Sequence, residues 1–318
     1  MSTKEKLLTL LESRRGEYLS GEEIASALRL SRASVWKAVS ALRKAGYAIQ
    51  AVTNRGYCLN PDTDILSVPG IRGYLEGESL NIIMLPETRS TNDLLRQQAE
   101  EGAAEGTALF AISQSAGRGR SGREFFSPPD TGLYFSVLLR PEPGRNAQSI
   151  TTMAAAAMCR TLETMGAYHP GIKWVNDLFV RGRKVCGILT EGAFSLEEGR
   201  LQYAVLGVGL NLYAPAGGFP GELANIAGPA FEEPLPDLKN RLTAEFLNRF
   251  FRYYRGQGDW VSVYRDRSLA IGREVEVLSA AGSRRALVLG IDDRCRLLVR
   301  YGDGTEDCLS YGEIRIRL

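Results

Sequence analysis

The first sixty residues carry three apolar stripes with helical spacing, followed by two short strand-like runs. Two of the stripes open at a serine that can cap a helix, Ser20 and Ser31, and Glu23 completes a capping-box pattern with Ser20. The third helix should be followed by a hairpin over residues 47–52 and 56–59. Three helices and a hairpin in this order indicate a winged helix-turn-helix.

This N-terminal segment is basic, and the rest of the chain is not. Residues 1–60 hold ten Lys and Arg against five Asp and Glu, whereas the remainder holds 29 against 32. No acidic residue occurs between Ile24 and Pro61. Positive charge confined to one small domain favours a polyanion as the partner of that domain alone.

The third helix is the one that would enter the major groove of DNA, with its first turns toward the bases. Its apolar positions are Val35, Trp36, Val39 and Leu42, of which Val35, Val39 and Leu42 would face the core. The predicted DNA-binding residues lie on its exposed face and at the hairpin tip, and they are Ser31, Arg32, Ala33, Ser34, Lys37 and Arg55. The alternative is a winged helix that no longer binds DNA and serves protein contacts, which the missing acidic residues disfavour.

Beyond a linker expected over residues 60–70, strand-like and helix-like patterns are mixed. Strands are expected at 81–85, 108–114, 133–139, 171–174, 178–180, 185–189 and 203–212, and helices at 92–101, 148–165 and 237–256. From Ile271, short strands separated by turns predict a small SH3-like β-barrel. We therefore predict an α+β protein with a winged helix-turn-helix over 1–62, a mixed α/β domain over 63–270 and a C-terminal β domain over 271–318.

Composition excludes several kinds of chemistry. The single histidine, His169, lies beside Pro170 and Gly171 in an expected loop, so a multi-histidine metal site is impossible and a Ser-His-Asp triad is disfavoured. The five scattered cysteines contain no Cys-x-x-Cys pair and are expected to be reduced core residues. No run approaches the roughly 18 apolar residues of a membrane-spanning helix, and the N-terminus lacks a signal-peptide pattern. We expect a cytoplasmic protein whose chemistry relies on Lys, Arg, carboxylates and backbone amides.

Residues 114–127 form the most informative segment, because Arg118, Arg120 and Arg123 alternate with three glycines. Glycine lets the backbone approach a ligand closely, and both exposed amides and guanidinium groups suit phosphate. The spacing is neither that of a P-loop nor that of a dinucleotide-binding motif. A flexible basic surface loop is the alternative, but Phe125 and Phe126 follow directly, and paired aromatics favour a loop that folds over a ligand.

Three further segments are candidates for the same site. The run from Ser90 to Asp93 offers hydroxyls and an amide at a helix start, although it also fits an ordinary cap. Lys173 lies in an otherwise apolar strand, where a buried lysine needs an anion unless it snorkels at a strand edge. Asp177, in the following turn, is a candidate ligand for hydrated magnesium. The glycines of residues 207–211 would admit an adenine or a neighbouring backbone, and structural packing explains them equally well.

Residues 114–122 resemble the glycine-arginine signature of biotin protein ligases. The segments Ser90-Thr91-Asn92, Lys173-Trp174-Val175-Asn176-Asp177 and 207–211 follow in the order and spacing of that family. The N-terminal winged helix and the C-terminal β module match its bifunctional bacterial type, the biotin operon repressors. The resemblance covers essentially the whole chain. Two positions depart from it, since Phe125 stands where the family often has Trp and Val175 where many relatives have Pro.

The resemblance implies a two-step reaction with ATP and biotin as substrates. Biotin is first converted to biotinyl-5′-AMP and is then transferred to a lysine of a biotin carboxyl carrier protein. Lys173 and Arg118 would be catalytic, and the biotin-binding residues would be Ser90, Thr91, Asn92, Gln114, Arg118, Gly119, Arg120 and Lys173. The residues for ATP and the adenylate would be Arg118, Arg120, Arg123, Phe125, Asn176 and Asn211. Mg²⁺ is expected with the nucleotide, but no residue is assigned as a metal ligand.

The same resemblance implies operator DNA of biotin genes as a partner and a homodimer when the adenylate is bound. No membrane partner is expected. A lipoate-type protein ligase is the alternative with the same adenylate chemistry, although the winged helix is not expected there. A second alternative is a ligand-sensing transcription factor without enzymatic activity, in which loss of Lys173 or of the arginines is expected.

Overall fold

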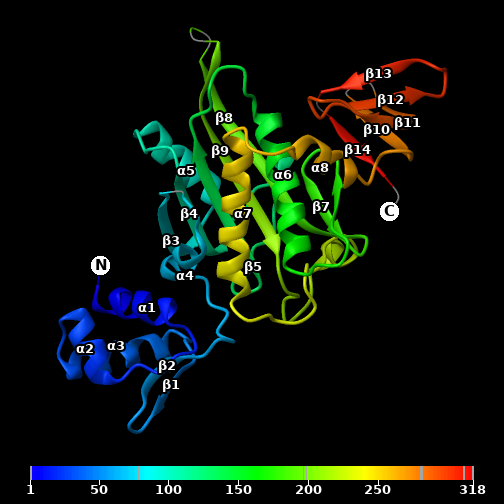
Figure 1. Ribbon diagram of the computed structural model, residues 1–318. Helices are drawn as coiled ribbons and strands as arrows, with labels where there is room; N and C mark the ends of the chain where they lie inside the picture. Colours follow the sequence, from blue (N-terminus) through cyan, green and yellow to red (C-terminus); the bar gives the residue numbers. More distant parts are fainter. Residues whose placement is uncertain are drawn as a thin grey trace. The chain divides into compact units, whose positions relative to one another are not determined.

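The computed structural model describes residues 2–77, 79–195, 197, 199–279, 282–310 and 312–316. Contacts group the chain into two compact units, Met1–Gly77 with Glu233–Leu247, and Glu78–Glu232 with Asn248–Leu318. Figure 1 labels their helices and strands along the chain. Each unit has its own hydrophobic core, and each is described separately.

Serine caps start the three N-terminal helices. α1 (Thr3–Ser13), α2 (Gly21–Leu28) and α3 (Arg32–Lys44) follow Ser2, Ser20 and Ser31, whose side chains accept hydrogen bonds from the first turn. The predicted capping box of Ser20 and Glu23 is present. The antiparallel hairpin consists of β1 (Ile49–Val52) and β2 (Gly56–Leu59), and it confirms the winged helix-turn-helix. Leu7, Leu11, Ile24, Val35, Val39 and Leu42 form the core of this domain.

The linker predicted over residues 60–70 is wrong at its C-terminal end. α4 (Val68–Tyr74) begins there at Ser67, whose hydroxyl accepts a hydrogen bond from Gly70 N at 3.0 Å. The Pro69-Gly70 pair resembles a chain break, but proline is well tolerated in the first turn of a helix. Asn240 Oδ1, on α7 (Leu238–Tyr254), accepts a hydrogen bond from the backbone of Ser67 at 2.9 Å. This part of the chain is therefore anchored by buried polar contacts.

Arg15 is the polar centre of this first unit. Its side chain is 11% exposed and lies between the carboxylates of Glu12 and Asp237, at 2.6 and 2.9 Å, each of them 4% exposed. It also donates to the carbonyl oxygen of Thr63 at 2.8 Å, and the Tyr74 hydroxyl donates to Asp237 at 2.8 Å. Because a buried charge is tolerated only when paired, Arg15 holds together α1, the segment after the hairpin and the start of α7.

The second unit is built on a seven-stranded mixed sheet. Its strand order is β3-β4-β5-β9-β8-β7-β6; β3 and β4 are parallel, and the other neighbours are antiparallel. In chain order the strands are β3 (Asn81–Thr88), β4 (Thr107–Gln114), β5 (Gly132–Leu139), β6 (Gly171–Lys173), β7 (Asp177–Val180), β8 (Arg183–Ser195) and β9 (Arg200–Asn211). Each predicted strand is present, most of them longer than predicted.

Two helices cover opposite faces of this sheet. On β8, the Thr190 hydroxyl lies 2.7 Å from that of Thr151 on α6 (Ala147–Thr164). The next residue, Glu191, accepts a hydrogen bond at 3.0 Å from Asn92 on α5 (Thr91–Glu100). Because successive strand residues point to opposite faces, α5 and α6 lie on different sides. The short helices of this unit are η1 (Arg120–Gly122), η2 (Gly221–Asn225) and α8 (Trp260–Asp266), and sequence patterns did not predict them.

The C-terminal module is a five-stranded antiparallel sheet with the order β13-β12-β11-β10-β14. Its strands are β10 (Glu274–Ser279), β11 (Gly282–Ile291), β12 (Leu297–Tyr301), β13 (Glu306–Leu309) and β14 (Glu313–Arg315). Strands were predicted at 274–278, 285–291, 297–301 and 305–310, which correspond to the first four, whereas β14 was not predicted. Val275 on β10, Val288 on β11 and Val299 on β12 are buried in its core. The indole N–H of Trp174 donates to the carbonyl oxygen of Cys295 at 3.0 Å, which joins this module to the strand region of the larger sheet.

Candidate functional site

Glycines on β8 and β9 form the floor of a cavity on the α5 face of the sheet. Gly207 and Gly209 are two residues apart on β9 and therefore share a face. A Cβ at Gly207 would lie 2.1 Å from Oδ1 of Asn92, and one at Gly209 would lie 2.6 Å from the ring of Phe125. Gly187, which pairs with Gly209, also adjoins that ring. The glycines thus make room for side chains that line the cavity, and the admission of an adenine there stays a prediction.

One end of the cavity is lined by uncharged polar groups. Ser90 caps α5, and the backbone N–H of Thr91 donates to Oε1 of Gln114 at 2.8 Å. The Ser136 hydroxyl is fully buried and lies 2.6 Å from Oδ1 of Asn92 and 2.8 Å from Oγ1 of Thr91. This chain of contacts orients hydroxyl and amide groups toward the cavity. Such a set offers both donors and acceptors to a small polar head group.

The glycine-arginine segment, residues 114–127, folds back on itself so that residues 117–119 run antiparallel to residues 123–125. The backbone N–H of Phe125 donates to Gly117 O at 2.8 Å, and that of Gly119 donates to Arg123 O at 2.7 Å. A Cβ at Gly117 would lie 2.4 Å from the carbonyl oxygen of Phe125, so this close approach requires glycine. Gly122 has φ +72°, a conformation that side chains disfavour. The glycines are therefore needed for the shape of the segment.

Arg118 is held by carboxylates at the polar end. Its guanidinium lies 2.5 Å from Asp93 and 3.0 Å from Glu191. The hydrogen bond with Asp93 is the main cause that raises the pKa of Arg118 above its ordinary value. Glu191 also accepts from Asn92 at 3.0 Å. The carboxylate of Glu191 thus contacts both Arg118 and Asn92.

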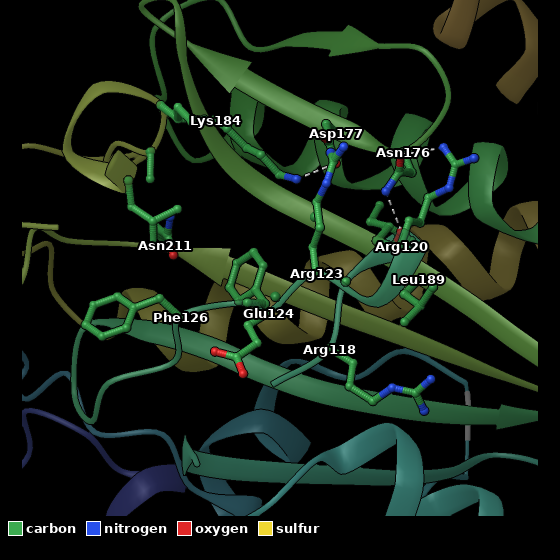
Figure 2. A pocket seen from close by; sticks show the side chains of 18 of the residues that line it. Arg118, Arg120, Arg123, Glu124, Phe126, Asn176, Asp177, Lys184, Leu189 and Asn211 are labelled. Carbon is green, nitrogen blue, oxygen red and sulfur yellow. Dashed lines mark hydrogen bonds and ion pairs between the residues drawn. The ribbon is translucent and has the colours of Figure 1, made fainter. Parts of the chain in front are cut away.

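Arg120 and Arg123 reach the opposite end (Figure 2). Arg120 donates to Oδ1 of Asn176 at 3.2 Å and to the carbonyl oxygen of Gly312 at 3.0 Å. Arg123 extends toward Asp177, whereas Arg118 points away from both. Asn176 is fixed in turn, because its amide donates to Ile188 O at 2.9 Å. Arg118 therefore lies at one end of the cavity, and Arg120 and Arg123 lie at the other.

Two lysines complete the cationic end. Lys173 lies on β6, the last strand in the order of the sheet, and its half-buried ammonium group is 5.9 Å from the ring centroid of Phe179. Its register partner on β7 is Asp177, which forms an ion pair with Lys184 at 2.7 Å. Lys173 is thus both an edge-strand lysine and a lining residue of the cavity. The Trp174–Val175 peptide bond directly after it is cis.

The cavity has a volume of about 700 Å³, which suits a nucleotide together with a small acid. Five cationic side chains line it, against three carboxylates. Phe125 supplies an aromatic surface whose ring packs edge-on against Tyr134, at 6.4 Å between centroids. The arrangement is suited to a polyanionic ligand with one apolar or aromatic portion and one uncharged polar head.

The comparisons with known proteins agree with this geometry. The sequence matches the Biotin/lipoate A/B protein ligase family over residues 84–211, an HTH domain over 3–58 and the Biotin protein ligase C terminal domain over 270–317. It is 31% identical over 319 residues to a bifunctional ligase/repressor BirA of Bacillus spizizenii, and the match covers 96% of this chain and 97% of that one. The chain belongs to the biotin protein ligase family.

Two more relatives extend the comparison. The bifunctional ligase/repressor BirA of Escherichia coli is 36% identical over 208 residues, which are 65% of this chain and 63% of that one. A biotin protein ligase from Aquifex aeolicus, solved in complex with biotin and ATP, has a TM-score of 0.62 at 25% identity and covers 74% of this chain and 98% of that one. These likenesses confirm the predicted family and the predicted ligase fold.

The predicted small-molecule residues of this biotin protein ligase lie together. All twelve line the cavity, and they are Ser90, Thr91, Asn92, Gln114, Arg118, Gly119, Arg120, Arg123, Phe125, Lys173, Asn176 and Asn211. Sequence reasoning missed Ser136 and Lys184. A serine inside the apolar run of β5 was the signal for Ser136. Lys184 is the second residue of β8, just after the turn from β7, where a lysine is unremarkable until its contact with Asp177 is seen.

The predicted DNA-binding residues lie on the winged helix-turn-helix of this biotin protein ligase. Ser31 caps α3, and its hydroxyl lies 2.9 Å from that of Ser34, so both hydroxyls are engaged at the helix start. Arg32, Ala33 and Lys37 are exposed on α3. Arg55, exposed in the hairpin turn, has its guanidinium 4.1 Å from the ring centroid of Tyr18. Their contacts with DNA stay predictions.

Other predictions concern composition. Four cysteines are buried and Cys308 is partly buried, all as free thiols, as expected for core residues. Among the described residues, no helix is long and apolar enough to cross a membrane.

Proposed function

We propose that this chain is an ATP-dependent biotin protein ligase and a biotin-responsive transcriptional repressor. The observation that carries the enzymatic part is the single cavity that joins an uncharged polar end, at Asn92 and Gln114, to a cationic end, at Lys173 and Arg120. Biotin offers a neutral ureido head and a carboxylate, and ATP offers phosphates and an adenine. The two ends match these two demands.

The first step joins biotin to AMP. A biotin carboxylate oxygen attacks the α-phosphorus of ATP, the bond from that phosphorus to the bridging oxygen breaks, and pyrophosphate leaves. Lys173 and the arginines stabilise the negative charge that develops on the phosphorus centre. Ser90, Thr91, Asn92 and Gln114 would hold the head of biotin, and Phe125, with Asn176 and Asn211, would hold the adenylate. The step needs no covalent enzyme intermediate.

Magnesium would be held beside Asp177. Mg²⁺ commonly binds proteins through one or two carboxylates together with substrate phosphates, and Asp177 lies at the cationic end where phosphates would be. When bound, the ion would neutralise phosphate charge. No group of three or more His, Cys, Asp and Glu side chains in the described part of the chain is placed to hold a metal ion alone.

The second step transfers biotin to protein. The ε-amine of a lysine on a biotin carboxyl carrier protein attacks the acyl carbon of biotinyl-5′-AMP, an amide forms, and AMP and a proton leave. The repressor activity would follow from binding of the winged helix to operator DNA in the cytoplasm, strengthened when the adenylate-bound chain forms a homodimer. The basic charge of residues 1–60 supports the DNA partner.

The ATP–pyrophosphate exchange reaction tests the enzymatic proposal. The parent chain is expected to exchange with biotin and not with lipoate, which separates it from a lipoate-type ligase. Lys173→Ala is expected to abolish exchange while its thermal unfolding is unchanged, and Lys173→Arg keeps the charge as a control. Exchange at the parent rate in Lys173→Ala would overturn the assigned role. A complete absence of exchange with biotin in the parent would favour a sensor without enzymatic activity.

A gel-shift assay with the upstream DNA of biotin genes tests the repressor proposal. Binding is expected to increase when biotin and ATP are both present and not with biotin alone. Equal binding in all conditions would show that DNA binding does not respond to the adenylate, and no binding would favour a winged helix with only protein contacts.

A further inference from the structure

A large apolar side chain is exposed on the helix that faces DNA in helix-turn-helix proteins. Trp36 of α3 is 62% exposed, although the sequence pattern places it in the apolar run of this helix. Its neighbours Val35 and Val39 are buried at 1% exposure each. The core of the domain is therefore complete without the indole. A tryptophan left in water forgoes the stabilisation that burial of its large apolar surface provides.

The surroundings of Trp36 indicate what kind of partner covers it. Of the residues one helical turn away, Arg32 and Ala33 before it are exposed, and after it Ser40 is partly exposed and Val39 is buried. Arg32 forms an exposed ion pair with Glu22 at 3.0 Å. Lys37 follows directly and is exposed. The whole interval 24–61 contains six Lys and Arg and no Asp or Glu. A cationic rim around an apolar centre with small neighbours fits a polyanion that also presents an apolar group.

We propose that Trp36 reads a thymine in the major groove of the operator, through contact of the indole ring with the thymine methyl group. This rests on the proposed repressor function and adds a base-reading residue to it. In the major groove the thymine C5-methyl is the apolar feature that distinguishes this base, and apolar side chains read it. Trp36 is the fifth residue of α3, in the part of a recognition helix that approaches the base edges.

Trp36 and the neighbouring cationic side chains should contribute differently to DNA binding, which makes the proposal specific. A contact from Lys37 to a phosphate would raise affinity for every sequence and steepen the dependence on salt. The indole carries no charge, so it contributes to sequence preference and leaves the salt dependence unchanged. The small side chains of Ala33 and Ser40 on the same face let the helix backbone approach the groove closely.

The experiment uses the full-length chain with biotin and ATP. Duplexes that bind it are selected from a random library, and each thymine of the selected duplex is then replaced by deoxyuridine, which lacks only the methyl group. The parent chain is expected to bind more weakly when the thymine at one position per half-site is replaced by deoxyuridine. The same replacement is expected to leave the affinity of Trp36→Ala unchanged. For the unmodified duplex, Trp36→Ala should bind at least about fourfold more weakly, which is the cost of losing one buried methyl-sized apolar contact. Its salt dependence should equal that of the parent, whereas Lys37→Ala serves as the control that lowers it.

Several results would overturn the inference. One is that deoxyuridine weakens the binding of the parent and of Trp36→Ala by the same factor. Another is that no thymine can be replaced with a loss of affinity. Either result would place the indole away from a methyl group. An unchanged operator affinity of Trp36→Ala, with weakened self-association, would assign the residue to a protein contact. A parent chain that selects no sequence overturns the repressor proposal and this inference together. Because Trp36 is exposed, Trp36→Ala and Trp36→Phe should unfold at the parent temperature.

Discussion

Replacing Gly207 by alanine should affect one end of the ligand cavity and leave the other end unchanged. A Cβ at this position would lie 2.1 Å from Oδ1 and 2.8 Å from Cγ of Asn92, far inside contact distance. Asn92 must therefore move, because the backbone of the central strand β9 is fixed by hydrogen bonds on both sides. Asn92 then leaves the Ser136 hydroxyl, now 2.6 Å away, and Glu191, now 3.0 Å away. The end of the cavity proposed for biotin is therefore disturbed, and the end proposed for the phosphates is not.

The magnitude follows from the contacts that are lost. Leaving a buried polar group without its partner costs about 1–3 kcal/mol, which is a factor of about 5 to 150 in affinity. We expect Gly207→Ala to raise the KM for biotin by such a factor and to leave the KM for ATP within about twofold. The measurement is ATP–pyrophosphate exchange with each substrate varied in turn.

Gly209→Ala is the matched control, two residues along the same strand. A Cβ there would lie 2.6 Å from the ring of Phe125, so we expect the KM for ATP to rise and that for biotin to stay the same. The reasoning would be refuted if both variants raised the same KM, or if Gly207→Ala raised only the KM for ATP. A general loss of stability would instead lower the activity of both variants without separating the two constants.

Three other variants test the site and the first unit. Arg118→Gly removes charged hydrogen bonds near the ligand, so biotinyl-5′-AMP should dissociate about 10- to 150-fold faster in a filter-retention chase, and retention equal to the parent would contradict the role of this arginine. Ser136→Ala should raise the KM for biotin about 2- to 10-fold with no change for ATP, and an unchanged KM would mean that the hydroxyl orients nothing. Arg15→Met should cost about 3–5 kcal/mol in the urea unfolding of the first unit, whereas the exposed Arg14→Met should cost almost nothing. Desolvation raises the pKa of Glu12 above its usual 4.5, so the charged form is disfavoured in the folded state, and the deficit of Arg15→Met should shrink as the pH falls through that raised value. A deficit that does not change with pH would mean that lost packing, rather than an unpaired carboxylate, is its cause.

Much of the fold followed from local patterns. The capping box at Ser20 and Glu23 and the apolar runs of the central strands are properties of neighbouring residues, and they were predicted correctly. α4 was missed because its only signals are a serine and a proline, and what holds it is Asn240, which is distant in the sequence. Tertiary contacts of that kind leave no local pattern. Trp36 belongs to the apolar run of α3 but not to the residues predicted to face the core, and its exposure agrees with that prediction.

The site was predictable as a set of residues and not as an arrangement. Four short motifs named the lining of the cavity, because each combines residue types that packing alone does not require. Sequence order gave no sign that Arg118 would lie between Asp93 and Glu191, or that the glycines of β9 would accommodate Asn92 and Phe125. These pairings depend on the register of β8 and β9, which the hydrophobic pattern does not encode in detail.

Glu191 would link the recognition of the two substrates. Its carboxylate contacts Arg118, which a phosphate or acyl-phosphate would attract, and Asn92, which would face the head of biotin. When Arg118 turns toward an incoming anion, Glu191 is free to hold Asn92 more firmly, and a firmly held Asn92 in turn leaves Arg118 more available. Binding free energies are reciprocal, so biotin should tighten the binding of ATP by the same factor as ATP tightens that of biotin. A single acidic side chain would thus make the two halves of the reaction assemble together.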